Sequence, residues 1–418
     1  MKNKRLINII TTVVFLGIIF SFSFAFVIKP GNISSSKERR YLQTLPVFTF
    51  EELKTGKFSS QINEYLNDQF PLRNAFVAVE CGAEKLLLKR ENNGVLFGRN
   101  GQLAVRLFPA YDGKLHGEVN GIAYSPPHTD LFYKDALTAQ LGVLSEFSNK
   151  LAAENIPLSV ILPPRTIDVA GSAFDYPSDN SDRLIAFVRE KTQKINLVDI
   201  YSEFRERYDN GEYIYYKTDH HWTTLGAYYA YVEVMKSFGM DYYEKEDFDI
   251  HAATVNFLGT TFSKSGFSSF TPDTIEYWTL RELPPENFTT IIYKGRTSEI
   301  ENSFSGFYDF SYLQKKADIP DEYGLFLSGT NAVTRISLTD GSPRPALMLF
   351  KDSFALSLAP FLALHFDIVM LDLAQARDIL LAGNTFRADA ALVCANFENL
   401  VTSGALSQLR NAAGLFSE

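Results

Sequence analysis

A carboxylate, two imidazoles and an indole stand side by side in the middle of the chain, in Asp219-His220-His221-Trp222. The second histidine follows the acid by two positions, so a short loop can present both side chains to one partner. A neutral imidazole can take a proton from a hydroxyl, and a carboxylate can fix which ring nitrogen faces that hydroxyl. The segment therefore predicts the base and the orienting acid of a catalytic site, which needs a nucleophile from elsewhere in the chain.

A candidate nucleophile lies near the C-terminus, between a predicted buried strand over 344–350 and a predicted apolar helix over 354–364. The connecting residues are Lys351-Asp352-Ser353. A strand-turn-helix junction exposes a serine hydroxyl and points the first free amides of the helix at the group beside it. We therefore predict a triad of Ser353 as nucleophile, His221 as general base and Asp219 as orienting acid, with the Ser353 amide as one oxyanion donor.

Each member of this triad also has a simpler explanation. Asp219 and His221 could form a buried pair or cap the helix expected from Thr224, and Ser353 could be a helix N-cap. Acid and imidazole side chains also suit zinc, but adjacent residues rarely converge on one ion, and the sequence contains no H-E-x-x-H cluster. We therefore expect neither a metal nor another cofactor.

Several other polar or aromatic residues are candidates for the oxyanion hole or for substrate contact. They are Arg165, His220, Trp222, Gly329, Asn331 and Asn396. Each has an alternative role. Trp222 beside a helix start is more typical of a core residue, and His220 would point away from its neighbour in an extended loop. Gly329 and Asn331 could be turn residues, and Arg165 could be a surface cation.

Helices and strands alternate through much of the chain, and the strands are nearly continuous in apolar residues. This pattern predicts an α/β fold whose parallel sheet carries helices on both faces. The expected strands are 158–162, 195–200, 344–350, 367–371 and 390–394, and the expected helices are 134–151, 182–194, 224–238, 354–364 and 374–381.

Two further features fall outside this alternation. The Asn100-Gly101 pair lies between short apolar runs and predicts a β-hairpin over 94–105. Residues 247–338 consist of short segments rich in Thr, Ser and Phe, such as 256–262. We expect them to form an insertion of short strands and loops that walls a substrate cleft.

The composition excludes some classes of function. The chain has 418 residues, 46% hydrophobic and 21% charged, with a net charge of −9 and no long Lys/Arg stripe, so nucleic acid is not an expected partner. The 35 Phe and 21 Tyr suit a deep core or surfaces that stack on sugar rings. Cys81 and Cys394 make no disulfide framework and are expected as buried small hydrophobic residues, although one bridge remains open in an oxidising compartment.

The N-terminus has the pattern of a membrane anchor. Residues 1–5 are basic and residues 6–27 carry no charge, which is about long enough to cross a bilayer. The charge asymmetry predicts an uncleaved signal anchor with the remaining chain outside the cytoplasm, and cleavage after Ser23 or Ala25 is the alternative. The expected organisation is a cytoplasmic tip and anchor over 1–29, a tether over 30–50 and a catalytic domain over 51–418.

These residues resemble a known group. Residues 218–223, with 351–354, look like the DHHW family of bacterial extracytoplasmic proteins and are more distantly similar to the alginate O-acetyltransferases, whose fold is a permuted SGNH-hydrolase domain. Residues 38–42, 65–73 and 94–98 resemble the same group. In that family the Asp-x-His pair precedes the serine, as it does here. The usual glycine and asparagine of the SGNH oxyanion hole have no clear counterpart in this sequence.

The resemblance implies an O-acetyltransferase at the cell membrane, which moves an acetyl group through a serine acyl-enzyme onto hydroxyls of an exopolysaccharide or cell-wall polymer. It also implies a membrane-bound O-acyltransferase as the source of the acyl group. Two alternatives remain open from the residues themselves. One is a carbohydrate acetylesterase that uses the same triad with water, and the other is a non-catalytic scaffold that binds polysaccharide.

Overall fold

The computed structural model of the chain describes residues 2–28, 31–105, 118–119, 122–123, 129–174, 181–267, 270–293, 299–314, 319–375, 386–402 and 405–412. The chain forms two compact units. Unit 1 comprises 1–92, 263–270 and 316–320, and unit 2 comprises 93–262, 271–315 and 321–418. Residues 51–92, which the sequence assigns to the catalytic domain, therefore cluster with the N-terminal part of the chain.

Unit 1 begins with an apolar helix, α1 (Lys2–Ile28). Its 25 residues from Lys4 onward are long and apolar enough to cross a membrane, with a mean hydropathy of 2.4, which fits a single-pass anchor. The following tether is held by ion pairs, because the Arg40 guanidinium lies 3.0 Å from Asp68 Oδ2. Three further helices complete the unit: α2 (Phe50–Lys54), α3 (Lys57–Asp68) and α4 (Arg73–Leu86).

Unit 2 is built on a sheet of eight strands in the order β13-β12-β14-β16-β15-β17-β8-β9. The five strands from β16 to β9 are parallel, as expected for an α/β fold. The bounds are β8 (Leu158–Ile161), β9 (Asn196–Val198), β12 (Phe288–Tyr293), β13 (Ile300–Ser305), β14 (Val333–Leu338), β15 (Ala346–Lys351), β16 (Asp367–Asp372) and β17 (Ala390–Cys394).

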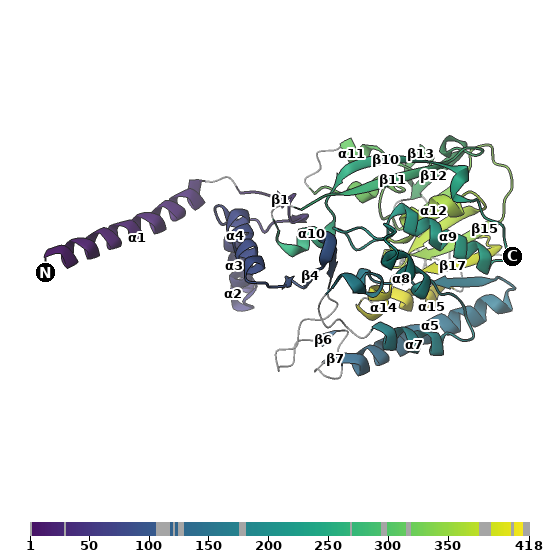
Figure 1. Ribbon diagram of the computed structural model, residues 1–418, viewed down its shortest axis with the longest axis horizontal. Helices are drawn as coiled ribbons and strands as arrows, with labels where there is room; N and C mark the ends of the chain where they lie inside the picture. The colour runs from purple at the N-terminus through teal and green to yellow at the C-terminus, as the bar shows by residue number, and fades with distance from the viewer. Residues whose placement is uncertain are drawn as a thin grey trace. The chain divides into compact units, whose positions relative to one another are not determined.

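Helices cover both faces of the parallel strands, which confirms the predicted fold class (Figure 1). Leu347 and Leu349 of β15 belong to the core beneath α9 and α12, whereas Met348 and Phe350 belong to the core beneath α5, α14 and α15. Side chains alternate between the faces of a strand, so a strand covered on both sides must be apolar throughout. The helix bounds are α5 (Thr129–Ala153), α6 (Thr166–Val169), α7 (Ser181–Lys191), α8 (Tyr201–Asp209), α9 (Thr224–Ser237), α12 (Ala355–Leu362), α14 (Phe397–Thr402) and α15 (Leu409–Ala412).

The insertion is more closely integrated than its sequence predicts. Its strands β12 and β14 pair with each other, and β14 pairs with β16 antiparallel to it, so the insertion extends the central sheet. Within the described part of the insertion, the strands outside this sheet are β10 (Phe248–Phe257) and β11 (Asp273–Leu280), which form a separate antiparallel pair. The short helices α10 (Thr260–Ser265) and α11 (Ser311–Gln314) also lie in this region.

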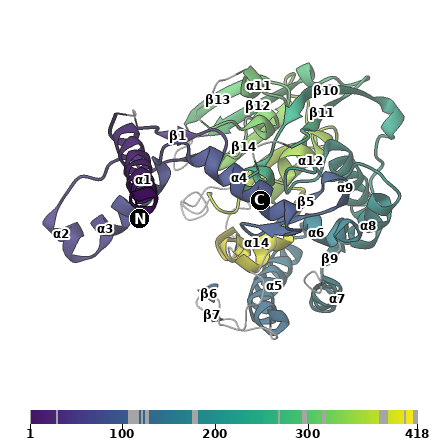
Figure 2. The same ribbon diagram turned by 60° about the vertical axis from the view of Figure 1, so that its left-hand side comes forward.

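The predicted hairpin is present in unit 2. Strands β4 (Val95–Phe97) and β5 (Leu103–Val105) pair antiparallel around a short 3-10 turn, η1 (Arg99–Gly101). Asn100 and Gly101 both have positive φ, which is the backbone conformation that Asn and Gly tolerate best in tight turns. Strand β5 lies beside α6, which in turn contacts α8 (Figure 2). Both cysteines are free and buried, and the helix expected over 374–381 falls largely outside the described residues.

A buried ion pair lies directly before the predicted nucleophile. Lys351 at the end of β15 is fully buried, and its ammonium lies 2.8 Å from Asp372 Oδ2 at the end of β16. Removing one partner of a buried pair leaves an uncompensated charge in the core and typically costs roughly 3–5 kcal/mol. We therefore expect Lys351→Met to lower the free energy of unfolding by about this amount, as measured by urea denaturation in detergent.

The matched control is Lys236→Met, which removes a lysine from the exposed ion pair with Glu233. Exposed pairs contribute roughly 0–1 kcal/mol, so this variant should unfold almost as the parent does. Equal losses in the two variants would contradict the importance assigned to the buried pair.

Candidate active site

The segment that carries the predicted base forms a closed loop in unit 2. Tyr215 and Trp222 form an antiparallel bridge, and the amide of Tyr216 donates to the His221 carbonyl at 3.2 Å. The Thr223 hydroxyl then accepts a hydrogen bond from the Gly226 amide at 3.3 Å and caps α9. Because the two ends of the loop are paired, the acid and the imidazoles between them have fixed positions.

A buried carboxylate from the insertion also holds this loop. Asp273, at the start of β11, accepts hydrogen bonds from the amides of Lys217 and Thr218 at 3.0 and 2.7 Å. It also accepts hydrogen bonds from the hydroxyls of Thr218 and Tyr213. Four donors on one carboxylate stop the loop from shifting relative to the insertion.

Ser353 lies where the elbow was predicted, between β15 and α12. Its side chain is half-buried, and the described residues include no partner for its amide N–H. The preceding carboxylate holds the elbow, because Asp352 accepts from the amide of Phe354 at 3.0 Å, the amide of Asn396 at 2.6 Å and the side chain of Asn399 at 2.8 Å. Burial raises the pKa of Asp352, and these three donors oppose that rise.

The loop and the elbow meet although 132 positions separate their residues. His221 Nε2 lies 2.7 Å from Ser353 Oγ, and His221 Nδ1 lies 2.6 Å from Asp219 Oδ1. These distances are those of direct hydrogen bonds. With the Nδ1 proton donated to the carboxylate, Nε2 presents its lone pair to the hydroxyl, which is the arrangement that general-base activation of a serine requires.

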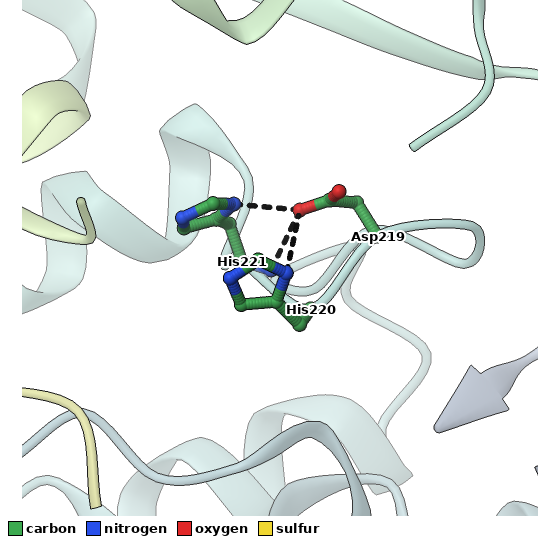
Figure 3. A group of neighbouring side chains, drawn as sticks. All are labelled: Asp219, His220 and His221. Atoms are coloured by element: carbon green, nitrogen blue, oxygen red, sulfur yellow. Dashed lines mark hydrogen bonds and ion pairs between the residues drawn. The ribbon is translucent and has the colours of Figure 1, made fainter. Parts of the chain in front are cut away.

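Asp219 is fixed through both of its oxygens. Figure 3 shows Oδ1 in contact with His221 and with His220 Nδ1, and the latter distance is 3.5 Å. Oδ2 accepts the amide and hydroxyl of Thr260 at 2.7 and 2.9 Å. Burial by itself raises the pKa of Asp219, but the two imidazoles and the hydrogen bonds from His221 and Thr260 outweigh it, so the pKa lies well below its usual value.

Aromatic rings enclose the base. The Tyr323 ring stacks on His221 with centroids 4.1 Å apart, and the Phe354 ring lies 4.8 Å away. Trp222 is fully buried and donates its indole N–H to the Phe354 carbonyl and the Ser357 hydroxyl, at 3.1 and 2.9 Å. Trp222 is therefore a core residue that joins the loop to α12, and its proposed contact with substrate is wrong because no part of its ring reaches solvent.

His220 does not point away from its neighbour as expected. Its ring centroid lies 3.9 Å from that of His221, because the loop bends here and is not extended. Its Nδ1 lies 2.9 Å from Thr260 Oγ1, so His220 is a hydrogen-bonding residue at the rim of the site. The ligand atoms of Asp219, His220 and His221 lie within 4.8 Å of one another. A cation bound to all three would have to displace the hydrogen bond between His221 and Asp219.

Arg165 occupies a different environment from the surface position considered for it. It is buried, and its guanidinium makes two hydrogen bonds to Asp168, at 2.8 and 2.7 Å. The ring of Phe397 lies 5.6 Å from its guanidinium carbon. The hydroxyl of Tyr201 also donates a hydrogen bond to Asp168 Oδ2, at 2.7 Å. A guanidinium engaged in this way ties α6 to α8 and α14 and is not presented to a substrate.

Gly329 and Asn331 lie in a turn, which is the alternative role that the sequence suggested for them. Gly329 has a φ of 78°, and the Asn331 side-chain amide donates to three carbonyls of its own turn, including that of Gly329 at 3.1 Å. Asn396 directs its side chain to the Pro163 carbonyl at 3.1 Å and its backbone amide to Asp352. The geometry thus supports Asn396 as a brace for the elbow and gives no support to the two turn residues as oxyanion donors.

The structure adds residues for which the sequence carries little signal. Thr260, Asp273 and Tyr323 all come from the insertion and contact Asp219, its loop or His221. Gly259, in the short segment 256–262, offers a weak signal for its neighbour Thr260, because glycine is typical of positions where the backbone approaches another group closely. Nothing local marks Asp273 or Tyr323.

Gly259 leaves room for Asp219. A Cβ at position 259 would overlap the Asp219 side chain. We expect Gly259→Ala to push the carboxylate away from His221 and to lower turnover about 100-fold, because a displacement near 1 Å can cost that much in rate. The measurement is kcat for hydrolysis of an activated ester.

Gly142→Ala in α5 is the control, since a methyl group there meets no atom within 4 Å. It should preserve turnover, and circular dichroism should show both variants folded. Turnover of the Gly259 variant equal to that of the control would show that the carboxylate tolerates displacement.

Comparison with solved structures gives the same architecture. A DHHW family protein from Eubacterium siraeum is 21% identical and superposes with a TM-score of 0.52, over 78% of this chain and 99% of that one. Bacillus cereus PatB1 with a sulfonyl adduct is 17% identical, with a TM-score of 0.54 over 73% of this chain and 95% of that one. These likenesses establish the fold.

Sequence comparison establishes the family. Among curated proteins, no significant match is found. The family model described as DHHW protein matches residues 150–371, which is more than half of the chain and includes the Asp219-His221 loop and the elbow with Ser353. The chain therefore belongs to the DHHW family.

Proposed function

We propose that this chain is an O-acyltransferase that moves an acetyl group through Ser353 onto hydroxyls of an extracytoplasmic polysaccharide. One observation carries the proposal. Ser353, His221 and Asp219 are joined by hydrogen bonds of 2.7 and 2.6 Å, although they come from separate parts of the chain. The resemblance to the alginate O-acetyltransferases supports acetyl as the group transferred and a sugar hydroxyl as its acceptor.

The first half-reaction would load the enzyme. Ser353 Oγ attacks the carbonyl carbon of an acetyl donor while its proton passes to His221 Nε2, and the ionised Asp219 stabilises the resulting imidazolium. The amide of Ser353, which has no partner among the described residues, would donate to the developing oxyanion. The bond to the leaving group then breaks, the leaving group takes the proton from His221, and the acetyl group remains as an ester on Ser353.

The second half-reaction would reverse these roles. An acceptor hydroxyl gives its proton to His221 and attacks the ester carbon, the bond to Ser353 Oγ breaks, and Ser353 regains the proton. Water in place of the sugar hydroxyl would give acetate, so transfer and hydrolysis differ only in the nucleophile. The apolar helix α1 supports a membrane-anchored enzyme. We propose that the enzyme works outside the cytoplasm and receives its acyl group from a membrane-bound O-acyltransferase, as the resemblance implies.

The deciding experiment gives the full chain, in detergent, 4-nitrophenyl acetate as donor with and without a mixture of cell-wall oligosaccharides. Mass spectrometry then compares acetylated sugar with free acetate. Acetylated sugar that depends on Ser353 would support the proposal. Acetate alone at every acceptor concentration would assign an esterase. The absence of both products would favour a non-catalytic scaffold.

A further inference from the structure

A solvent-open cleft of about 620 Å³ lies in unit 2 outside the triad. Its volume falls within the roughly 300–1,000 Å³ that is typical of ligand pockets. Four pieces of chain line it: the turn η1 with the following Gln102, residues 172–173, the C-terminal end of α8, and the segment from Gly211 to Lys217. Lys217 belongs to the lining and precedes Asp219 by two residues, so a molecule in the cleft would contact the segment that leads into the catalytic loop.

Hydrogen bonds fix the floor of this cleft. The buried Gln102 donates from Nε2 to the Tyr216 carbonyl at 3.0 Å and accepts the Tyr208 hydroxyl at Oε1, also at 3.0 Å. The Leu103 amide donates to the Lys217 carbonyl at 2.9 Å. Strand β5, α8 and the catalytic loop are therefore tied together, and the cleft is formed before any ligand arrives.

The lining combines aromatic rings with polar groups. Tyr208 is half-buried and Tyr213 is 37% exposed. Burial raises the pKa of Tyr208 to about 12, so its hydroxyl is neutral at ordinary pH. A sugar ring has a face of C–H groups and a rim of hydroxyls, and aromatic rings beside hydrogen-bonding side chains match both surfaces.

The charges in the cleft balance. Arg99 and Lys217 supply two cations, and Asp209 and Glu212 supply two anions. Asp209 accepts a hydrogen bond from the Ser172 hydroxyl at 2.5 Å. A mixture of donors and acceptors with no net charge suits neutral hydroxyl groups better than it suits a uronate or a phosphate, and the net charge of −9 on the whole chain also opposes a polyanion.

Lys217 is the polar group best placed to bind a ligand. In the part of the chain that the structure describes, its ammonium pairs with no carboxylate, although its backbone is held at both ends by Asp273 and Leu103. An ammonium has three N–H donors. These donors are available to ligand hydroxyls, and the fixed backbone keeps the lysine at the wall of the cleft.

We propose that this cleft is a subsite for a neutral sugar ring of the acceptor polysaccharide, separate from the ring that receives the acetyl group. The inference rests on the proposed function, because it takes the acceptor to be a glycan chain long enough to contact both the cleft and Ser353. Binding at the cleft would hold the polymer while Ser353 acetylates another position, so acceptor length would affect the KM for the acceptor.

The first test measures binding and needs no catalysis. Full-length Ser353→Ala protein in detergent is titrated with fully N-acetylated chitohexaose, which is neutral, and with hexagalacturonate by isothermal calorimetry. The neutral hexamer is expected to bind more tightly. Tighter binding of the uronate oligomer, or no binding of either, would overturn the proposed subsite.

The second test places the binding at the cleft. Lys217→Glu removes the ammonium and should weaken chitohexaose binding more than tenfold, and Asn100→Gly, which retains the positive φ of 56°, should weaken it severalfold. Lys150→Glu, at an exposed position of α5, is the matched control and should bind as the parent does. Binding unchanged in both cleft variants would refute the subsite.

The same variants, made in the chain that retains Ser353, separate this inference from the proposed function. If acetyl transfer occurs and the KM for the hexamer is unchanged by Lys217→Glu, the subsite is wrong and the transferase stands. If the hexamer binds at the cleft but no acetylated sugar forms, the subsite stands and the transferase is wrong.

Discussion

Ser353→Ala is expected to abolish both acetyl transfer and ester hydrolysis while leaving the chain folded. The hydroxyl makes the covalent bond in each half-reaction, and it lies 2.7 Å from His221 Nε2, the base that takes its proton. Loss of the serine in a triad typically lowers kcat by a factor on the order of 10⁴ to 10⁶. The measurement is the rate of 4-nitrophenol release together with acetylated sugar, compared between variant and parent.

Covalent labelling gives an independent readout of the same residue. A sulfonyl fluoride should modify the parent at Ser353 and leave Ser353→Ala unmodified, as intact mass spectrometry would show. Ser342→Ala, at an exposed position in the loop before β15, is the matched control and should retain both labelling and activity. Activity of the Ser353 variant at the level of this control would remove the basis of the proposed function.

Asp219→Asn is expected to produce the second largest loss, on the order of 10⁴-fold in kcat. The neutral amide no longer offers a charged acceptor for the hydrogen bond from His221 Nδ1–H. It therefore favours the wrong tautomer of the ring, in which Nε2 carries the proton and cannot act as the base. Both carboxylate oxygens accept hydrogen bonds, from His221 and from Thr260. In the Asn variant an NH₂ group replaces one of these oxygens, so two hydrogen-bond donors would face each other. Near-wild-type turnover in this variant would assign Asp219 a purely structural role.

The same substitution should alter the dependence of stability on pH. The pKa of Asp219 is lowered in the folded chain, so its carboxylate stabilises the fold above the unfolded pKa of about 3.9, and this contribution is lost as the pH falls through the folded value. The parent should therefore lose more stability than Asp219→Asn below about pH 4. Melting temperatures of the two chains between pH 3 and pH 7 would check this, and parallel curves would contradict it.

Much of the site could be predicted because its signals are local. One signal is an acid two residues before a histidine, and the other is a serine between an apolar strand and an apolar helix. Both are patterns of spacing and hydrophobic period that can be recognised without knowledge of distant contacts. The alternation of helices with apolar strands indicates a layered α/β fold for the same reason. The burial of Trp222 also follows from its position before an amphipathic helix.

Other predictions were wrong because they treated loops in isolation. Arg165 was expected to be exposed or to face a substrate, but Asp168 and Phe397 enclose it, and the position of Phe397 depends on how β17 returns beside β8. The ring of His220 lies over that of His221 because the paired ends of the loop force a bend that an extended segment would not have.

The amino-acid sequence marks the Asp219-His221 pair, the elbow that presents Ser353 and the alternation of helices with apolar strands, since each of these signals lies within a few positions of the chain. That the pair and the elbow, 132 positions apart, meet in a triad follows only from the fold. The fold also makes the insertion extend the sheet and brings Thr260, Asp273 and Tyr323 onto the loop that carries Asp219 and His221. Those contacts join residues about 40 to 100 positions apart. No periodic pattern records such pairings, because they follow from where the sheet places the chain after it has folded.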